Sequence, residues 1–182
     1  MSDLELSREA MRGVPLFAQF TDLECDQIAG AASRMKFQSG EVVLRQGKSS
    51  QNLWVLLEGS CQVFRQMVDN RQHEEEVVLA ELPQGSTFGE MSFFHAAPHS
   101  ASVRAKTPVQ VLRLEKGRYD ALLASGSKAA MKLAVNTVTM MAERLRKMDD
   151  WVVDLLMRTG EQRNQPEWMQ LRDKMFRGWD NV

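Results

Sequence analysis

The chain has 182 residues and a formal net charge of −1, which is enough length for one domain with a sizeable core plus an extension. This charge balance gives no reason to expect nucleic acid or a membrane surface as a direct partner, and no apolar run approaches the roughly 20 residues of a membrane span. The polar N-terminus, with Asp3, Glu5 and Glu9, argues against a signal or transit peptide. Cys25 and Cys61 lie far apart without metal-binding spacing, as expected of two reduced thiols in a cytoplasmic protein.

The first predicted element is a helix over about residues 22–33. Thr21 can cap this helix, because Glu24 three positions later completes a capping box. The expected apolar face of the helix comprises Leu23, Ile28, Ala31 and Ala32.

Short strands separated by turn residues follow the helix. About eight strands in roughly 80 residues are typical of a small antiparallel barrel or sandwich. The stretch Leu53–Leu57 is almost wholly apolar and therefore predicts a buried strand. The expected strands include residues 35–38, 41–45, 53–57, 60–66, 75–82, 101–105 and 109–114, with a hairpin tip at 69–72.

The stretch from Gly85 to Ala105 organises the rest of the chain. Gly85 and Gly89 bracket a tight turn, residues 90–94 can form one helical turn, and Pro98 ends any helix. The first turn of a short helix presents unpaired N–H groups and the positive end of its dipole. A glycine at the helix mouth lets a phosphate approach the backbone closely, so these residues predict an anion site.

The same stretch resembles a known motif. It reads Phe88-Gly89-Glu90, continues through a short apolar helix, and ends as Pro98-x-x-Ala101-Ser102-Val103-x-Ala105. This pattern is similar to the phosphate-binding cassette of cyclic nucleotide-binding domains, a family that includes kinase regulatory subunits and bacterial activator proteins. The resemblance extends over about residues 14–158. It implies an α+β fold: an antiparallel β jelly-roll barrel with flanking helices, a long C-terminal dimerisation helix and a short terminal helix.

The resemblance also implies a ligand, cyclic AMP or cyclic GMP, and a role for each cassette residue. In such domains the glutamate holds the ribose 2′-hydroxyl, the helix amides hold the cyclic phosphate, and an arginine neutralises the phosphate. Glu90 matches the glutamate, although it could instead be a carboxylate satisfied by the helix dipole alone. The implied ligand-binding residues are Phe88, Gly89, Glu90, Met91, Ser92, His99, Ser100, Ala101 and Ser102.

His99 stands where the family has its arginine. Arginine would supply a permanent forked charge, whereas the charge of histidine changes near neutral pH. Losing a charge-assisted bond typically forfeits about 1.5–3 kcal/mol. His99 therefore predicts weak binding, binding that strengthens at acidic pH, or no binding. Arg104 lies too far along its strand to replace the arginine, whereas His95 is another possible donor. The purine-contacting region of the long helix in activator-like members corresponds to Met148-Asp149, which has no hydroxyl.

After a short helix at 116–123, a helix without proline or glycine is predicted over about residues 127–158. Apolar residues recur along it at alternating steps of three and four, which is a heptad pattern. We expect this stripe to be the seam of a parallel homodimer, as in the activator branch of the family; the alternative is packing on the helix's own barrel. The seam residues are Met131, Ala134, Val138, Met141, Leu145, Met148, Val152 and Leu155. A second stripe, available for the barrel, comprises Leu133, Val135, Met140 and Ala142.

The last segment, residues 159–182, predicts a tail with an amphipathic helix. One face of that helix carries Trp168, Leu171, Met175 and Trp179. These side chains either pack back on the domain or the dimer, or anchor a partner protein, because tryptophan is enriched at binding hot spots. The predicted division is residues 1–126 for the barrel domain, 127–158 for the dimerisation helix and 159–182 for the tail.

These features predict a stand-alone homodimeric cyclic nucleotide-binding regulatory or sensor domain that signals through protein–protein contacts. The alternative is a degenerate domain that binds no nucleotide and serves as a dimeric adaptor. Residues 159–182 are too few for a helix-turn-helix domain, so direct DNA binding is not expected. No catalytic triad or phosphate-binding loop of an NTPase is readable, and His73, His95 and His99 do not form the metal set of a cupin, so neither an enzyme nor a metal is expected. The sequence leaves cyclic AMP, cyclic GMP and a cyclic dinucleotide open as ligands.

Overall fold

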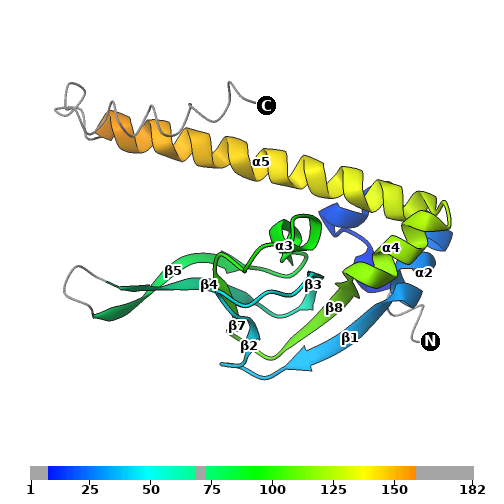
Figure 1. Ribbon diagram of the computed structural model, residues 1–182, viewed down its shortest axis with the longest axis horizontal. Coiled ribbons are helices and arrows are strands. Elements are labelled where there is room, and N and C mark those ends of the chain that lie inside the picture. Colours follow the sequence, from blue (N-terminus) through cyan, green and yellow to red (C-terminus); the bar gives the residue numbers. More distant parts are fainter. Residues whose placement is uncertain (1–7, 69–72, 159–182) are drawn as a thin grey trace. The chain divides into compact units, whose positions relative to one another are not determined.

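The computed structural model describes residues 8–68 and 73–158 (Figure 1). Within these ranges, eight strands form two four-stranded antiparallel sheets, as in a jelly-roll-like sandwich. One sheet has the order β1-β8-β3-β6, made of Ala32–Phe37, Val109–Glu115, Asn52–Glu58 and Thr87–Phe88. The other has the order β2-β7-β4-β5, made of Val42–Leu44, Ser102–Ala105, Cys61–Val68 and Glu74–Leu82. The predicted fold class is confirmed, whereas the hairpin tip at 69–72 and the terminal helix lie outside the described residues.

Helical segments flank the sheets. They are η1 (Pro15–Phe17), α2 (Asp22–Ala31), α3 (Glu90–Phe94), α4 (Lys116–Ala124) and α5 (Lys128–Arg158). The cassette helix α3 has the predicted bounds. Helix α2 ends two residues earlier than predicted, because Ala32 is already extended and pairs with Leu114 of β8.

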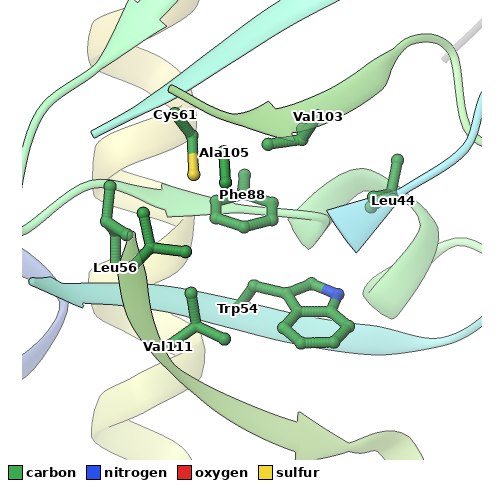
Figure 2. Close-up of a cluster of buried hydrophobic side chains, with 9 residues drawn as sticks. Leu44, Trp54, Leu56, Cys61, Phe88, Val103, Ala105 and Val111 are labelled. Atoms are coloured by element: carbon green, nitrogen blue, oxygen red, sulfur yellow. The ribbon is translucent and has the colours of Figure 1, made fainter. Parts of the chain in front are cut away.

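The core lies between the two sheets. Trp54 of β3 stacks on Phe88 of β6 with ring centroids 6.1 Å apart and an interplanar angle of 3°. Figure 2 shows this pair among side chains from both sheets. The cluster comprises Leu44, Trp54, Leu56, Cys61, Phe88, Val103, Ala105, Val109 and Val111. All five residues of the predicted buried strand Leu53–Leu57 are buried, as their unbroken apolar run implied.

The predicted capping box of α2 is present. The amide of Glu24 donates to Thr21 Oγ1 at 3.3 Å, and the amide of Thr21 donates to Glu24 Oε2 at 2.8 Å. The predicted apolar face was partly wrong. Leu23 is 68% exposed, whereas Cys25 and Ile28, one turn apart, are buried. Cys25 thus takes the inner position that the pattern had given to Leu23.

The chain divides into two compact units, Met1–Val138 and Thr139–Val182, with the boundary inside α5. In the first unit, the start of α5 buries Ala129, Ala130, Leu133 and Thr137. Leu133 was predicted in this role, and Met140 of the same stripe is half-buried. The stripe was wrong at Val135, which is 64% exposed, and at Ala142, which is also exposed. The side chain of Thr137 fits the inner face because its hydroxyl donates to the carbonyl of Leu133 at 2.7 Å, which satisfies the polar group within the helix.

Polar bonds fasten the same helical turns to the N-terminal segment. Lys132 Nζ donates to the carbonyl of Gln19 at 2.9 Å and to Glu24 Oε2 at 2.7 Å. The amide nitrogen of Asn136 donates to the carbonyls of Leu16 at 2.9 Å and Ala18 at 3.0 Å. The first turns of α5 are therefore held by hydrogen bonds as well as by apolar packing.

Candidate functional site

The turn that enters α3 strongly favours glycine. Gly89 precedes the helix in a left-handed conformation, with φ 81° and ψ 1°. A Cβ at this position would lie 2.6 Å from the carbonyl oxygen of Asn52 and 3.0 Å from Trp54 Cδ1. Because the nearest atom belongs to the backbone, it cannot move aside cheaply. Gly89 thus lets the chain pass close to β3 and start a helix whose first N–H groups have no intrahelical acceptor.

Glu90 is the first residue of α3 and is buried, with 8% of its surface exposed. Its carboxylate lies at the helix end where the dipole favours negative charge. Phe88, also predicted at the site, lies in the core cluster. Met91 is 59% exposed on the outer side of α3. Of the predicted cassette residues, Met91 and Ser100 are exposed and Gly89 and Ala101 are half-buried, whereas the others are buried.

His99 is 7% exposed and both ring nitrogens are hydrogen-bonded. Nδ1 lies 2.8 Å from Ser92 Oγ, and Nε2 lies 2.8 Å from Ser50 Oγ. The hydroxyl of Ser92 also donates to the carbonyl of Gly89 at 3.3 Å. This arrangement is satisfied when Nδ1–H donates to Ser92 and the Ser50 hydroxyl donates to Nε2. Burial lowers the pKa of His99, so the imidazole is neutral at neutral pH.

The loop between β2 and β3, residues 45–51, is bound to the second half of the cassette. The amide of Gly47 donates to the carbonyl of His99 at 2.9 Å, and the amide of His99 donates to the carbonyl of Lys48 at 2.9 Å. The amide of Gln46 donates to Ser102 Oγ at 2.9 Å. Sequence reasoning missed this loop and Ser50, because the turn around Gly47 has no local signal that identifies its distant partners.

Arg104 is engaged away from α3. Its guanidinium pairs with Glu76 at 2.5 Å, donates to Gln62 Oε1 at 3.1 Å and lies 4.5 Å from the ring centroid of Phe64. His95 is exposed at the end of α3. Among the described residues, no group of three or more His, Cys, Asp and Glu side chains could hold a metal ion.

The predicted seam residues lie on α5. Within the first unit, Met131 is 49% and Val138 is 66% exposed. In the second unit, Met141, Leu145 and Met148 are exposed, whereas Val152 is half-buried, as is Ala134 in the first unit. The side chain of Leu155 and the residues Trp168, Leu171, Met175 and Trp179 lie outside the described residues. Within the described ranges, no helix combines the length and the apolar character that crossing a membrane requires.

Comparison with known proteins identifies the family. The family model described as cyclic nucleotide-binding domain matches residues 34–125, which include every strand after β1 and the whole of α3. The chain belongs to the cyclic nucleotide-binding domain family. The predicted family is thereby confirmed, and the match ends at the last residues before α5.

Relatives of this domain include regulatory proteins. A cAMP-dependent protein kinase regulatory subunit of Emericella nidulans is 33% identical over 110 residues, 60% of this chain and 25% of that protein. The Cyclic AMP receptor protein of Thermus thermophilus is 30% identical over 139 residues, 76% of this chain and 61% of that protein. The chain thus spans about a quarter of the length of the curated kinase subunits that it matches.

Solved structures agree in fold. The Thermus thermophilus catabolite activator protein superposes with a TM-score of 0.67 at 30% identity and covers 79% of this chain and 63% of that one. A cyclic nucleotide-binding domain from Methylobacillus flagellatus superposes with a TM-score of 0.71 at 22% identity and covers 83% of each chain. The second likeness concerns the fold alone.

Proposed function

We propose that the chain is a non-enzymatic regulatory or sensor domain that binds cyclic AMP or cyclic GMP at the cassette and signals through protein contacts. The observation that carries this proposal is the turn at Gly89, which packs against β3 and delivers a buried Glu90 to the first position of α3. This turn would bring the cyclic phosphate to the helix amides and the ribose hydroxyl to Glu90. The names of the relatives mention cyclic AMP and support that nucleotide as the ligand.

In this proposal His99 does not supply a permanent charge to the phosphate. The neutral ring bridges Ser92 and Ser50 until a bound anion favours its protonated form. Binding would then take up a proton, and the affinity for nucleotide would rise as the pH falls. The remaining attraction for the phosphate would come from the α3 amides and the exposed Ser100.

The test is calorimetric titration with cyclic AMP and cyclic GMP at about pH 6.0 and 7.5, on either side of the ordinary histidine pKa. Each titration is repeated in two buffers of different ionisation enthalpy, so that the observed heat reports proton uptake. Tighter binding at the lower pH with proton uptake supports the role of His99. Flat titrations up to millimolar ligand would sink the proposal for both nucleotides.

A second candidate function is a dimeric adaptor that binds no nucleotide. It is favoured by the complete hydrogen bonding of His99 inside the protein, which leaves no ring nitrogen open to a ligand. A His99→Arg variant that also fails to bind nucleotide would support the adaptor. Gain of binding in that variant would instead indicate a competent pocket limited by its missing cation.

We also propose that the exposed seam of α5 forms a parallel homodimer. With Val138 and Val152 at a positions, Arg144 takes a g position and Asp149 the e position of the following heptad. In a parallel pair, these two residues face each other across the seam twice. Such charge complementarity supports the parallel orientation over the antiparallel one.

The buried free thiols Cys25 and Cys61 fit a reducing compartment and support a cytoplasmic location.

A further inference from the structure

Helices α2 and α4 border a groove of about 450 Å³ on the first unit. Small side chains leave space in the groove, and one positively charged side chain, that of Arg118, lies at its rim. The lining residues are Gln27, Gly30, Ala31, Arg118, Ala121 and Leu122. Arg118 is exposed, and no acidic side chain of the described residues pairs with its guanidinium. The groove therefore suits a segment that is both apolar and acidic.

The N-terminal segment runs along α2 toward this groove. Residues 8–11 are helical, and Arg12 contacts Asp22 at 3.4 Å. Arg8, one turn earlier in the chain, bonds Asp26 at 3.0 and 2.5 Å and lies 3.4 Å from Asp22. The N-terminal segment thus runs antiparallel to α2. One further turn in that direction reaches the level of Gly30, which lines the groove.

We propose that residues 1–7 dock in the groove between α2 and α4. The segment reads Met-Ser-Asp-Leu-Glu-Leu-Ser, so Leu4 and Leu6 would fill the apolar space while Asp3 or Glu5 pairs with Arg118. The segment carries two acidic and no basic side chains, whereas residues 159–182 carry four acidic and four basic ones. Charge complementarity with the rim thus favours the N-terminal segment over the tail.

Two residues that line the groove are hydrogen-bonded to the residue before α5, so docking would affect the start of that helix. Gln27, in the wall of the groove, accepts a hydrogen bond from the hydroxyl of Ser127 at 2.8 Å. Ser127 immediately precedes α5, and its amide donates to the carbonyl of Leu122, another lining residue, at 3.1 Å. The docked segment would therefore brace the corner at which α4 gives way to α5.

Disulfide formation between introduced cysteines tests the docking in the full chain. The test variant carries Leu4→Cys and Ala121→Cys, and the control carries Leu4→Cys with Arg65→Cys, an exposed position on β4. Native Cys25 and Cys61 are buried and give little background, since burial raises the pKa of both thiols, that of Cys61 to about 11. We expect the Ala121 pair to close within one chain at least about tenfold faster than the control pair. Equal rates, closure in neither variant, or bridges between chains would overturn the proposal.

Charge reversal separates a specific fit from chance encounters. In the Ala121 disulfide variant, adding Arg118→Glu should slow closure, because Asp3 and Glu5 then meet a like charge. Adding Asp3→Lys and Glu5→Lys to that background should restore the rate. A rate that ignores both reversals would contradict the pairing with Arg118. Arg118 is exposed, so circular dichroism should show that every variant retains the fold.

Discussion

His99 Nδ1 lies 2.8 Å from Ser92 Oγ, so the residue predicted to stand at the family's arginine position is bonded directly to the cassette helix. The same ring reaches Ser50 in the loop before β3, also at 2.8 Å. In this chain the position therefore links two segments of the protein. A cation that binds a phosphate would instead need its charged group open to the ligand. This difference leads to the first two predictions.

Replacing His99 with arginine should strengthen nucleotide binding. A permanent charge near the phosphate typically contributes about 1.5–3 kcal/mol, or roughly 10–150-fold in affinity. The same change should lower the melting temperature, because the Ser92 and Ser50 bonds are lost. Calorimetry and thermal unfolding measure the two effects. The matched control is His95→Arg, an exposed site at the end of α3, which should change neither. Equal affinity gains in both variants would mean that net charge alone is responsible.

The stability of the fold should fall as the solution becomes acidic because of His99. Burial lowers its folded pKa, so below the ordinary histidine pKa the unfolded chain binds more protons than the folded one. The contribution is complete above about pH 6.5 and is lost as the pH falls through the folded pKa. Urea unfolding between about pH 7.5 and 5 should show a steeper loss for the native chain than for His99→Gln. Parallel curves for the two would assign the acid sensitivity to other groups.

A Cβ at Gly89 should disrupt the cassette turn. Gly89→Ala meets a backbone oxygen at 2.6 Å and requires φ 81°, which should cost about 1–3 kcal/mol or more and abolish nucleotide binding. Gly117→Ala in α4 is the matched control, because nothing lies within 4 Å of its Cβ position and alanine favours the helix by about 0.5–1 kcal/mol. Chemical denaturation measures both. An unaffected Gly89→Ala would show that β3 moves to accept it.

Asn136 should matter more for stability than its partial exposure suggests. Its side-chain amide donates to two backbone carbonyls, those of Leu16 and Ala18, and Asn136→Ala leaves both without this donor. We expect a loss of about 1–2 kcal/mol in the free energy of unfolding. Lys128→Ala, exposed on the same helix, should cost far less. If the two variants unfold alike, water replaces the amide at no cost.

Charge reversal across the α5 seam should report the orientation of the dimer. Arg144→Glu places like charges opposite Asp149 twice in a parallel pair and should weaken association about tenfold. Adding Asp149→Lys should restore it, and Leu145→Asp, at an a position, should give monomers. Sedimentation equilibrium measures all three. Restoration is not expected from an antiparallel pair, and a native chain that stays monomeric at high concentration would remove the seam altogether.

Local patterns predicted the elements that depend on neighbouring residues. The bounds of α3 follow from Gly89 before it and Pro98 after it, and the capping box of α2 is complete within four residues. The buried strand β3 was readable because both of its faces are covered, which leaves an unbroken apolar run.

Long-range pairing was not readable in the same way. The bond between His99 and Ser50 joins residues 49 positions apart, and neither position carries a pattern that names the other. The stripe predicted for the barrel placed Val135 inward, yet Val135 is exposed and the buried residue is Thr137. The hydroxyl of Thr137 is satisfied by the carbonyl of Leu133 in the same helix. An apolar periodicity counts apolar residues only. It therefore overlooks a buried polar residue whose hydrogen bond is made within its own helix.

The stack of Trp54 on Phe88 has an optical consequence. The indole lies in the interior of the sandwich and contacts the strand residue that directly precedes Gly89. Trp151, in contrast, is 73% exposed on the second unit. The emission of Trp54 is that of a chromophore shielded from water, and that of Trp151 is quenched by solutes that never reach the core. In a variant with Trp168→Phe and Trp179→Phe, fluorescence can thus follow the cassette turn and the surface of α5 as separate signals without an added label.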